Sequence, residues 1–187
     1  MIYKKSQAHG TKFPSVWDKI PKRMGLLSQT SKTEVRQMIT FQTDGVVMPD
    51  IDKKKATEWI AAVVASYGRR PGTLGYTFCS DERILEVNVQ FLGHDYYTDI
   101  ITFDYCRADV VRGDMIISLD TVLTNSQQFV PAFDATRFRS AYDQELHRVI
   151  IHGILHLCGI NDKGPGEREI MEAAENRALA LFPTMER

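Results

Sequence analysis

The chain has 187 residues, of which 43% are apolar and 25% are charged, and its formal net charge is −1. This length and composition are typical of one globular domain and exclude collagen-like, coiled-coil and disordered chains. Three cysteines do not make a disulfide framework, so we expect a reducing compartment. No apolar run is long enough to span a bilayer, and the first residues lack the apolar segment of a secretory signal. We therefore expect a cytoplasmic protein.

The charge is unevenly distributed along the chain. Residues 1–37 carry eight basic and two acidic residues, a balance of +6, and the other 150 residues carry 15 basic and 22 acidic residues, a balance of −7. The near-neutral total argues against a basic nucleic-acid binder. The basic segment itself is rich in Ser and Thr and shows no helical or strand periodicity. We therefore predict a flexible N-terminal extension over residues 1–37. An RNA-contacting arm, translated upstream sequence and an organelle transit peptide all stay open as explanations of it.

Strand and helix patterns follow one another through residues 38–187, which we interpret as a single domain. Strands are predicted at 39–42, 74–79, 100–103 and 115–118, and helices at about 52–67, 80–92, 120–129, 138–158 and 167–181. Residues 69–72 and 131–136 are predicted to form a turn and a loop. The short gap between the last two strands favours an antiparallel hairpin. The predicted fold class is therefore α+β, with a small mixed sheet packed with helices.

A pair of histidines lies in the long helix predicted over 138–158. His152 and His156 share one helix face, a spacing at which two imidazoles can reach one metal ion. Gly159 can end the helix in a left-handed conformation and turn the chain back, so that Asp162 supplies a third ligand. Two nitrogens and one carboxylate leave a fourth position for water, as in catalytic zinc sites. In the alternative, both histidines are core residues without a metal, and they then need other hydrogen-bond partners.

The segment from His152 to Asp162 resembles the signature of the YbeY family of metal-dependent endoribonucleases, also called rRNA maturation factors. In this chain the segment reads His-Gly-x-Leu-His-Leu-x-Gly, with the third ligand at position 162. Residues 98–103 are similar to the family's Thr-Asp-Val-Leu-Ser-Phe strand, residues 113–118 to its Gly-Asp-Ile strand, and residues 85–88 to the end of the preceding helix. The resemblance covers residues 38–182.

The resemblance implies an activity and its partners. It implies a zinc-dependent endoribonuclease, with one zinc ion per chain, that cleaves single-stranded RNA in ribosomal RNA processing and ribosome biogenesis. The implied partners are an rRNA precursor, the ribosome or ribosomal proteins. We expect no membrane or DNA partner. The implied zinc ligands are His152, His156 and Asp162.

Two positions depart from the family pattern. The family usually has a histidine in place of Asp162; a carboxylate is an acceptable zinc ligand, but its negative charge makes the metal-bound water less acidic. The family usually has an arginine in place of Leu92, so a cation that would stabilise charge on the phosphate is missing there. Four basic residues are candidates to replace it or are ordinary surface charges: Arg69, Arg70, Arg148 and Lys163.

Two other functions remain open at this point. The ligand spacing also resembles that of the metzincin zinc peptidases, which place a glutamate general base directly after the first histidine. This chain has Gly153 there, and loss of a general base costs about 10²–10⁴-fold in rate. A glycine also avoids repelling an anionic phosphodiester, which favours a nuclease. The second alternative is a non-catalytic, metal-stabilised ribosome-assembly factor, which Leu92 and the acidic domain keep open.

Three further carboxylates are candidates to orient the ligands or a water molecule. Asp99 and Asp114 each open a predicted strand, and Glu145 lies two helical turns before the first histidine on the same face. Ordinary hydrogen bonding at strand ends explains the two aspartates equally well. The sequence identifies no general base. His94 and His147 are predicted to be exposed.

Overall fold

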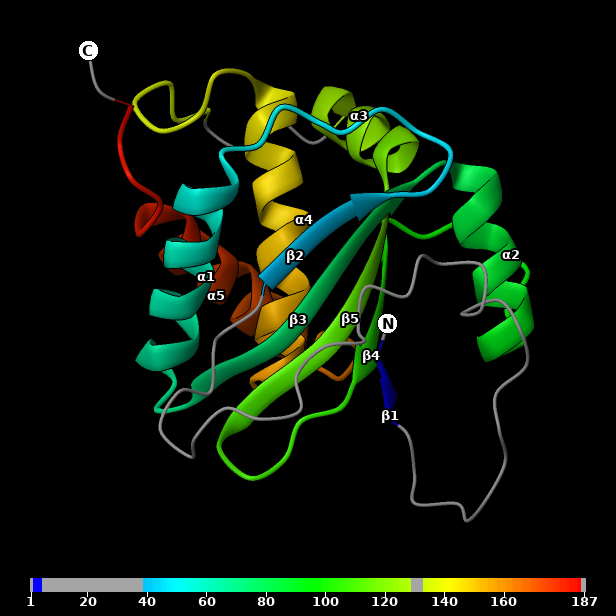
Figure 1. Cartoon of the computed structure of the whole chain (residues 1–187), viewed down its shortest axis with the longest axis horizontal. Coiled ribbons are helices and arrows are strands. Elements are labelled where there is room, and N and C mark those ends of the chain that lie inside the picture. Colours follow the sequence, from blue (N-terminus) through cyan, green and yellow to red (C-terminus); the bar gives the residue numbers. More distant parts are fainter. Residues whose placement is uncertain (1, 5–38, 129–132, 186–187) are drawn as a thin grey trace, which may run out of the picture.

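The computed structural model describes residues 2–4, 39–128 and 133–185, so most of the predicted extension lies outside the described residues. At its centre is a five-stranded mixed sheet with the order β1-β4-β5-β3-β2 (Figure 1). The strands are β1 (Ile2–Lys4), β2 (Ile39–Thr43), β3 (Arg70–Cys79), β4 (Ile100–Asp104) and β5 (Val110–Ser118).

The strand directions confirm the predicted mixed sheet and hairpin. β2, β3 and β5 are parallel to one another, whereas β4 and β5 form the antiparallel hairpin, with Thr102 opposite Met115. β1 runs parallel to β4 at the edge of the sheet. No strand was predicted in residues 1–37, so β1 is a correction to the sequence analysis. Its three residues form a strand because they pair with backbone groups that β4 would otherwise leave without hydrogen bonds.

β3 and β5 are both longer than predicted. β3 begins at Arg70, inside the predicted turn, because Arg70 and Pro71 pair with Val110 and Val111 of β5. The register shifts between Pro71 and Leu74, where proline cannot donate to the ladder. The turn predicted over residues 69–72 is therefore an irregular strand start.

Five helices surround the sheet. They are α1 (Lys53–Ser66), α2 (Asp81–Leu92), α3 (Leu119–Gln128), α4 (Ala141–Leu157) and α5 (Glu167–Ala180). The side chains of Asp52, Ser80 and Ser140 accept hydrogen bonds from the first backbone N–H groups of α1, α2 and α4. All five lie within a few residues of their predicted bounds. None of the helices in the described ranges is long and apolar enough to cross a membrane.

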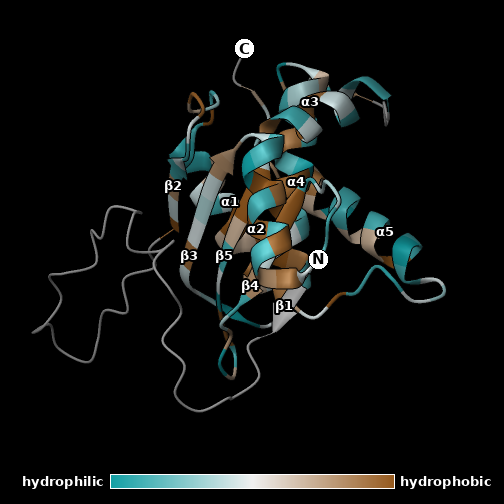
Figure 2. Cartoon of the chain, turned by 90° about the vertical axis from the view of Figure 1, so that its right-hand side faces the viewer, coloured by the Kyte–Doolittle hydropathy of each residue, from teal (hydrophilic) through white to brown (hydrophobic). Residues whose placement is uncertain are grey.

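The helices form two layers around the sheet. α1, α4 and α5 share the larger core cluster on one face, while α2 packs on the other face against Ile101, Phe103 and Ile116 (Figures 1 and 2). α4 lies close against the sheet because it presents Gly153 there. A Cβ atom at Gly153 would lie 2.9 Å from Ile100 Cδ1 and 2.9 Å from Met115 Cγ. This close packing fixes the position of the helix that carries the histidine pair.

Candidate metal centre

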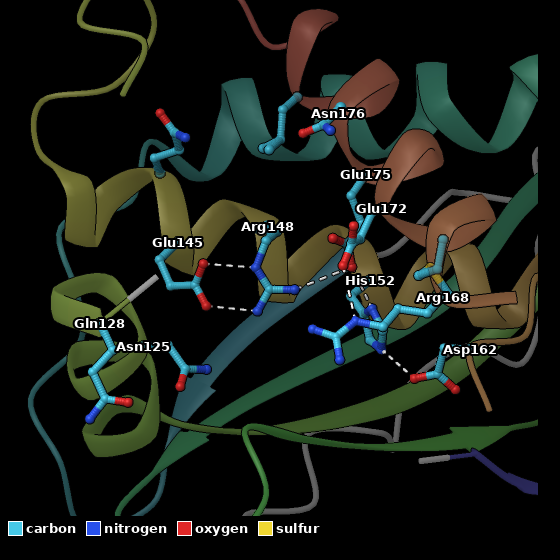
Figure 3. Close-up of a pocket in the computed structure, with 13 residues that line it drawn as sticks. Asn125, Gln128, Glu145, Arg148, His152, Asp162, Arg168, Glu172, Glu175 and Asn176 are labelled. Carbon is cyan, nitrogen blue, oxygen red and sulfur yellow. Dashed lines mark hydrogen bonds and ion pairs between the residues drawn. The ribbon is translucent and has the colours of Figure 1, made fainter. Parts of the chain in front are cut away.

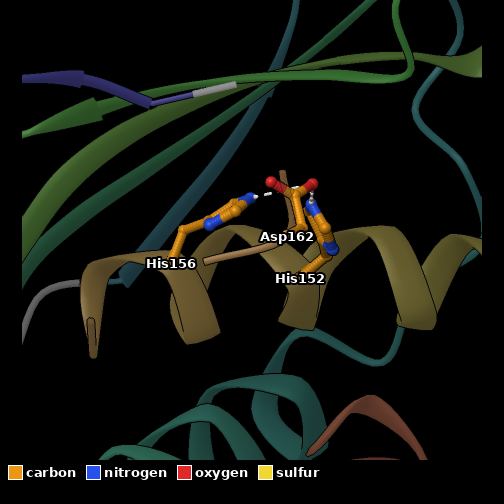
Figure 4. A group of neighbouring side chains, drawn as sticks. All are labelled: His152, His156 and Asp162. Atoms are coloured by element: carbon orange, nitrogen blue, oxygen red, sulfur yellow. Dashed lines mark ion pairs between the residues drawn. The ribbon is translucent and has the colours of Figure 1, made fainter. Parts of the chain in front are cut away.

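The C-terminal half of α4 and the turn after it bring three potential metal ligands together. Gly159 has a φ of 101°, the left-handed conformation predicted for it, and its N–H donates to the carbonyl of His156 at 2.8 Å. The chain therefore turns back immediately after the helix. The turn places Asp162 over the face of α4 that carries His152 and His156 (Figure 4).

The spacing of the three side chains fits one metal ion. Asp162 Oδ2 lies 3.7 Å from His152 Nε2 and 3.6 Å from His156 Nε2, and one ligand atom from each residue lies within 4.8 Å of the others. Ligand atoms around a tetrahedral zinc ion, each about 2.1 Å from the metal, are about 3.4 Å apart. The described residues could therefore hold a metal after small side-chain shifts.

The second ring nitrogen of each histidine is already bound. His156 Nδ1 lies 2.8 Å from the carbonyl oxygen of Ile160, and His152 Nδ1 lies 2.6 Å from Glu175 Oε1. Because a carbonyl oxygen only accepts hydrogen bonds, Nδ1 of His156 must carry the proton. In the neutral ring, Nε2 then presents its lone pair to Asp162.

The resulting cluster has the composition of a metal site. His156 Nε2 is buried and has no hydrogen-bond partner among the described residues. Burial, followed by the neighbouring His152, lowers the pKa of His156 to about 4, so its ring is neutral near pH 7. A lone-pair nitrogen and a carboxylate oxygen repel each other across this distance, and a cation bound to both atoms removes the repulsion. Nitrogen and oxygen donors of this kind suit zinc.

A buried ionic network contacts Nδ1 of His152, the ring nitrogen that does not face Asp162 (Figure 3). Glu175 Oε1 accepts hydrogen bonds from His152 Nδ1 and, at 3.2 Å, from Arg148 Nη1. Arg148 also forms a bidentate pair with Glu145, with both distances 2.7 Å, and lies 3.5 Å from Asp99 Oδ2. Burial alone would lower the pKa of Arg148, but Glu145, Glu175 and Asp99 raise it above its ordinary value. The network therefore keeps a permanent cation beside Glu175.

Two of the three predicted carboxylates lie in this network, and one lies elsewhere. Asp99 and Glu145 both contact Arg148 rather than a histidine. Asp114 does not face the candidate ligands, because side chains alternate along β5. Its neighbours Gly113 and Met115 face α4, so Asp114 projects to the opposite face, beside Gly75 and Tyr105. The prediction that Asp114 orients a ligand is therefore wrong.

Of the four candidate cations, Arg148 is the one that contacts Glu175, the carboxylate bonded to His152. The Arg69 guanidinium donates to the carbonyl oxygens of Leu157 and Ala108, so it caps the end of α4. Arg70 pairs with Asp109 at the surface, and Lys163 is exposed. Leu92 packs with the smaller core cluster under α2.

Two other predictions need correction. His147 is not exposed: only 2% of it is accessible, its Nδ1 lies 2.7 Å from the carbonyl oxygen of Asp143, and its ring packs against Phe182. α4 is buried on nearly all sides by the sheet and three helices, so even a polar position is enclosed. Gly153 was explained from sequence as avoiding repulsion of an anionic phosphodiester. In the structure it faces the sheet and not the candidate ligands, so the close packing of α4 on the sheet explains why this position is a glycine.

Glu175 is the partner of His152 that the sequence did not reveal. Its side chain is only 7% exposed. It lies in the apolar stripe of α5 formed by Met171, Ala174, Ala178 and Leu179. An acidic residue in such a stripe is unusual unless it has a charged or hydrogen-bonded partner. An acidic residue in this stripe could have indicated from sequence that Glu175 has a buried partner. Which residue that partner is depends on how α5 packs on α4.

A pocket of about 740 Å³ opens beside His152 and Asp162 (Figure 3). It lies between α3, α4 and α5 and includes the side chains of Arg148 and Arg168. The centre therefore adjoins a space that can receive part of a substrate.

Fold and site together define an α+β protein with a two-histidine, one-aspartate group on a buried helix. Among known proteins, the family model described as "Endoribonuclease YbeY" matches residues 38–182. A protein named Endoribonuclease YbeY from Bacteroides thetaiotaomicron is 67% identical over 143 residues, covering 76% of this chain and 98% of that protein. A protein of the same name from Porphyromonas gingivalis is 51% identical and covers 77% of this chain and 89% of its own length.

A solved structure agrees with this assignment. The solution structure of TM1509 from Thermotoga maritima has a TM-score of 0.52 and 26% sequence identity, covering 78% of this chain and 89% of that one. The chain therefore belongs to the YbeY endoribonuclease family. The prediction of an RNA-cleaving hydrolase is confirmed at the level of this family, which favours it over the peptidase and the non-catalytic assembly factor.

Proposed function

We propose that this chain is a zinc-dependent endoribonuclease that cleaves single-stranded RNA during ribosomal RNA processing and ribosome biogenesis in the bacterial cytoplasm. Its curated relatives are bacterial proteins named as endoribonucleases. Residues 38–187 form the catalytic domain in this proposal, and residues 1–37 are an extension to it. The family match over residues 38–182 supports that division.

The observation that carries the proposal is the buried group of His152, His156 and Asp162, which we propose as the ligands of one zinc ion. His156 Nε2 faces the Asp162 carboxylate with no hydrogen-bond partner among the described residues. When bound, zinc supplies a Lewis acid that polarises a phosphoryl oxygen, activates water, or does both.

Hydrogen bonds from surrounding residues orient the two histidine rings for metal binding. Glu175 fixes the ring of His152, and the Ile160 carbonyl fixes that of His156. Such partners set the tautomer and orientation of a ligating histidine. Asp99 and Glu145 do not contact a histidine. They pair with Arg148, which pairs in turn with Glu175, the partner of His152.

Arg148 is a poor replacement for the family arginine missing at Leu92. Its guanidinium already contacts Glu145, Glu175 and Asp99, and only 24% of its side chain is exposed. A phosphate would have to compete with three carboxylates for it. Arg168, whose side chain is 78% exposed at the mouth of the pocket, is the more accessible cation there.

RNA cleavage by the purified full chain tests the proposal. We expect a single-stranded RNA substrate to be cut, the activity to disappear with a chelator, and zinc to restore it. His156→Ala and Asp162→Asn should abolish both cleavage and stoichiometric zinc binding. Asp109→Asn is the matched control, because Asp109 pairs with Arg70 at the surface. Full cleavage by the two ligand variants would refute the assignment.

A further inference from the structure

The pocket beside the metal ligands has a lining that suits a neutral, hydrogen-bonding ligand. Its walls include four amide side chains from three helices: Asn125 and Gln128 of α3, Gln144 of α4 and Asn176 of α5. Asn125 and Gln128 are three residues apart and therefore share one face of α3, which is turned to the pocket (Figure 3).

Three of these amides are available to a ligand. Gln144 accepts a hydrogen bond from the backbone N–H of Asp134 at 2.8 Å and is buried. Within the described ranges, the side-chain amides of Asn125, Gln128 and Asn176 take part in no hydrogen bond. Each amide offers one acceptor oxygen and two N–H donors.

The charges in the pocket are balanced once a divalent metal is present. The lining has four carboxylates, Glu145, Asp162, Glu172 and Glu175, against the guanidinium groups of Arg148 and Arg168. Arg148 pairs with Glu145 and Glu175, and Arg168 pairs with Glu172 at 3.0 Å. A bound zinc ion adds the remaining two positive charges. A second phosphate would find no net positive charge to attract it in this pocket. An uncharged polar group would meet no electrostatic repulsion there.

We propose that this pocket receives one unpaired nucleobase of the RNA, next to the phosphate that lies at the metal centre. This inference rests on the proposed function, and it assigns base recognition to Asn125, Gln128 and Asn176. Single-stranded RNA is read through bases splayed out of the stack and hydrogen-bonded along their edges, and amide side chains match the mixed donors and acceptors of those edges. His152 and Asp162 belong both to the pocket and to the ligand group, so the base and the scissile phosphate belong to neighbouring positions of one strand.

A binding experiment tests the pocket without requiring cleavage. The zinc-loaded full chain, labelled with nitrogen-15, is titrated with AMP, CMP, GMP and UMP in turn, and the side-chain amide resonances are followed by NMR. We expect at least one nucleotide to shift the resonances of Asn125, Gln128 and Asn176. The shifts elsewhere around the pocket should fall in the triple variant Asn125→Ala, Gln128→Ala, Asn176→Ala. Gln127→Ala, an exposed neighbour on α3 that does not line the pocket, is the control.

A cleavage experiment tests the consequence for specificity. A pool of single-stranded RNA with randomised sequence is cut by the parent chain, and the products are sequenced. We expect a base preference on the order of tenfold at one position beside the cut, lost in the triple variant and kept in Gln127→Ala. Nucleotides that leave the three amide resonances unshifted, or a triple variant with the parent's preference, would overturn the proposal. If the parent cuts no RNA, the proposed function fails, while the nucleotide titration still decides whether the pocket binds a base.

Discussion

Replacing Glu175 tests how far the network behind His152 prepares the metal centre. Glu175→Gln keeps the shape of the side chain and removes its charge, whereas Glu175→Ala removes the acceptor altogether. The native carboxylate is 7% exposed and lies 2.6 Å from His152 Nδ1, a short distance typical of a charge-assisted hydrogen bond. Both changes therefore act on the orientation and basicity of a proposed ligand without touching the metal.

The size of the effect follows from this contact. Losing a hydrogen-bond partner behind a ligating histidine costs about 10–100-fold in metal affinity. The amide introduced by Glu175→Gln still offers an acceptor oxygen, so we expect this variant to weaken zinc binding by about tenfold. Glu175→Ala should weaken it by about 100-fold, or about 2.8 kcal/mol. Arg148 keeps its bidentate partner Glu145 in both variants, which limits damage to the fold.

The assay is zinc affinity, measured by competition with a chromogenic chelator at pH 7, with thermal unfolding recorded in parallel. Glu172→Gln is the matched control: Glu172 lines the same pocket from the same helix but pairs with Arg168 instead of a histidine. We expect the control to change zinc affinity less than about twofold, since it touches no proposed ligand. If Glu175→Gln and Glu172→Gln bind zinc equally, the network does not orient His152 and this reasoning fails.

Three further predictions concern packing, pH and the basic segment. Gly153→Val should lower the free energy of unfolding by about 2–3 kcal/mol, because side-chain atoms of Ile100 and Met115 lie 2.9 Å from the position of a new Cβ; chemical denaturation checks this against the exposed Ala62→Val, and equal stability of the two variants would contradict it. In the metal-free protein, the pKa of His156 is lowered from 6.5 to about 4 by burial and by His152. The unfolded chain therefore binds this proton first as the pH falls. The free energy of unfolding should decrease by about 3 kcal/mol between about pH 7 and pH 4, and His156 should contribute no change above about pH 7.5. Urea unfolding at several pH values checks this, and His156→Gln should flatten the slope. Changing Lys12, Lys19, Lys22, Arg23 and Lys32 to Gln lowers the charge of residues 1–37 from +6 to +1. If this segment contacts RNA, the salt dependence of RNA binding should fall by about 0.7 in log–log slope for each lost phosphate contact, and an unchanged slope would show that it does not.

The proximity of His152, His156 and Asp162 could be predicted from sequence because its geometry is local. A four-residue spacing on a helix fixes the relation of His152 to His156, and a glycine three residues later gives the turn that returns Asp162. The strand hairpin was predictable for the same reason, since its short connection leaves few alternatives. In these cases the relevant distances are set by a few consecutive residues.

The residues that sequence reasoning misplaced depend on packing between distant elements. The role of Glu175 requires α5 to lie against α4, and the position of Asp114 depends on which face of β5 meets α4. Arg148 collects carboxylates from α4, α5 and the start of β4, which no helical pattern reveals. His147 was assigned to the surface because a histidine pattern alone cannot show that α4 is enclosed on nearly all sides.

X-ray absorption at the zinc edge of the purified full chain measures which atoms surround the bound zinc ion. We expect one zinc ion per chain, with only nitrogen and oxygen neighbours at about 2.0–2.2 Å, two of them imidazoles. Asp162→Asn should lose this zinc under the same conditions. A chain that binds no zinc, or a spectrum with sulfur neighbours at about 2.3 Å, would contradict the assignment of His152, His156 and Asp162 as the ligands.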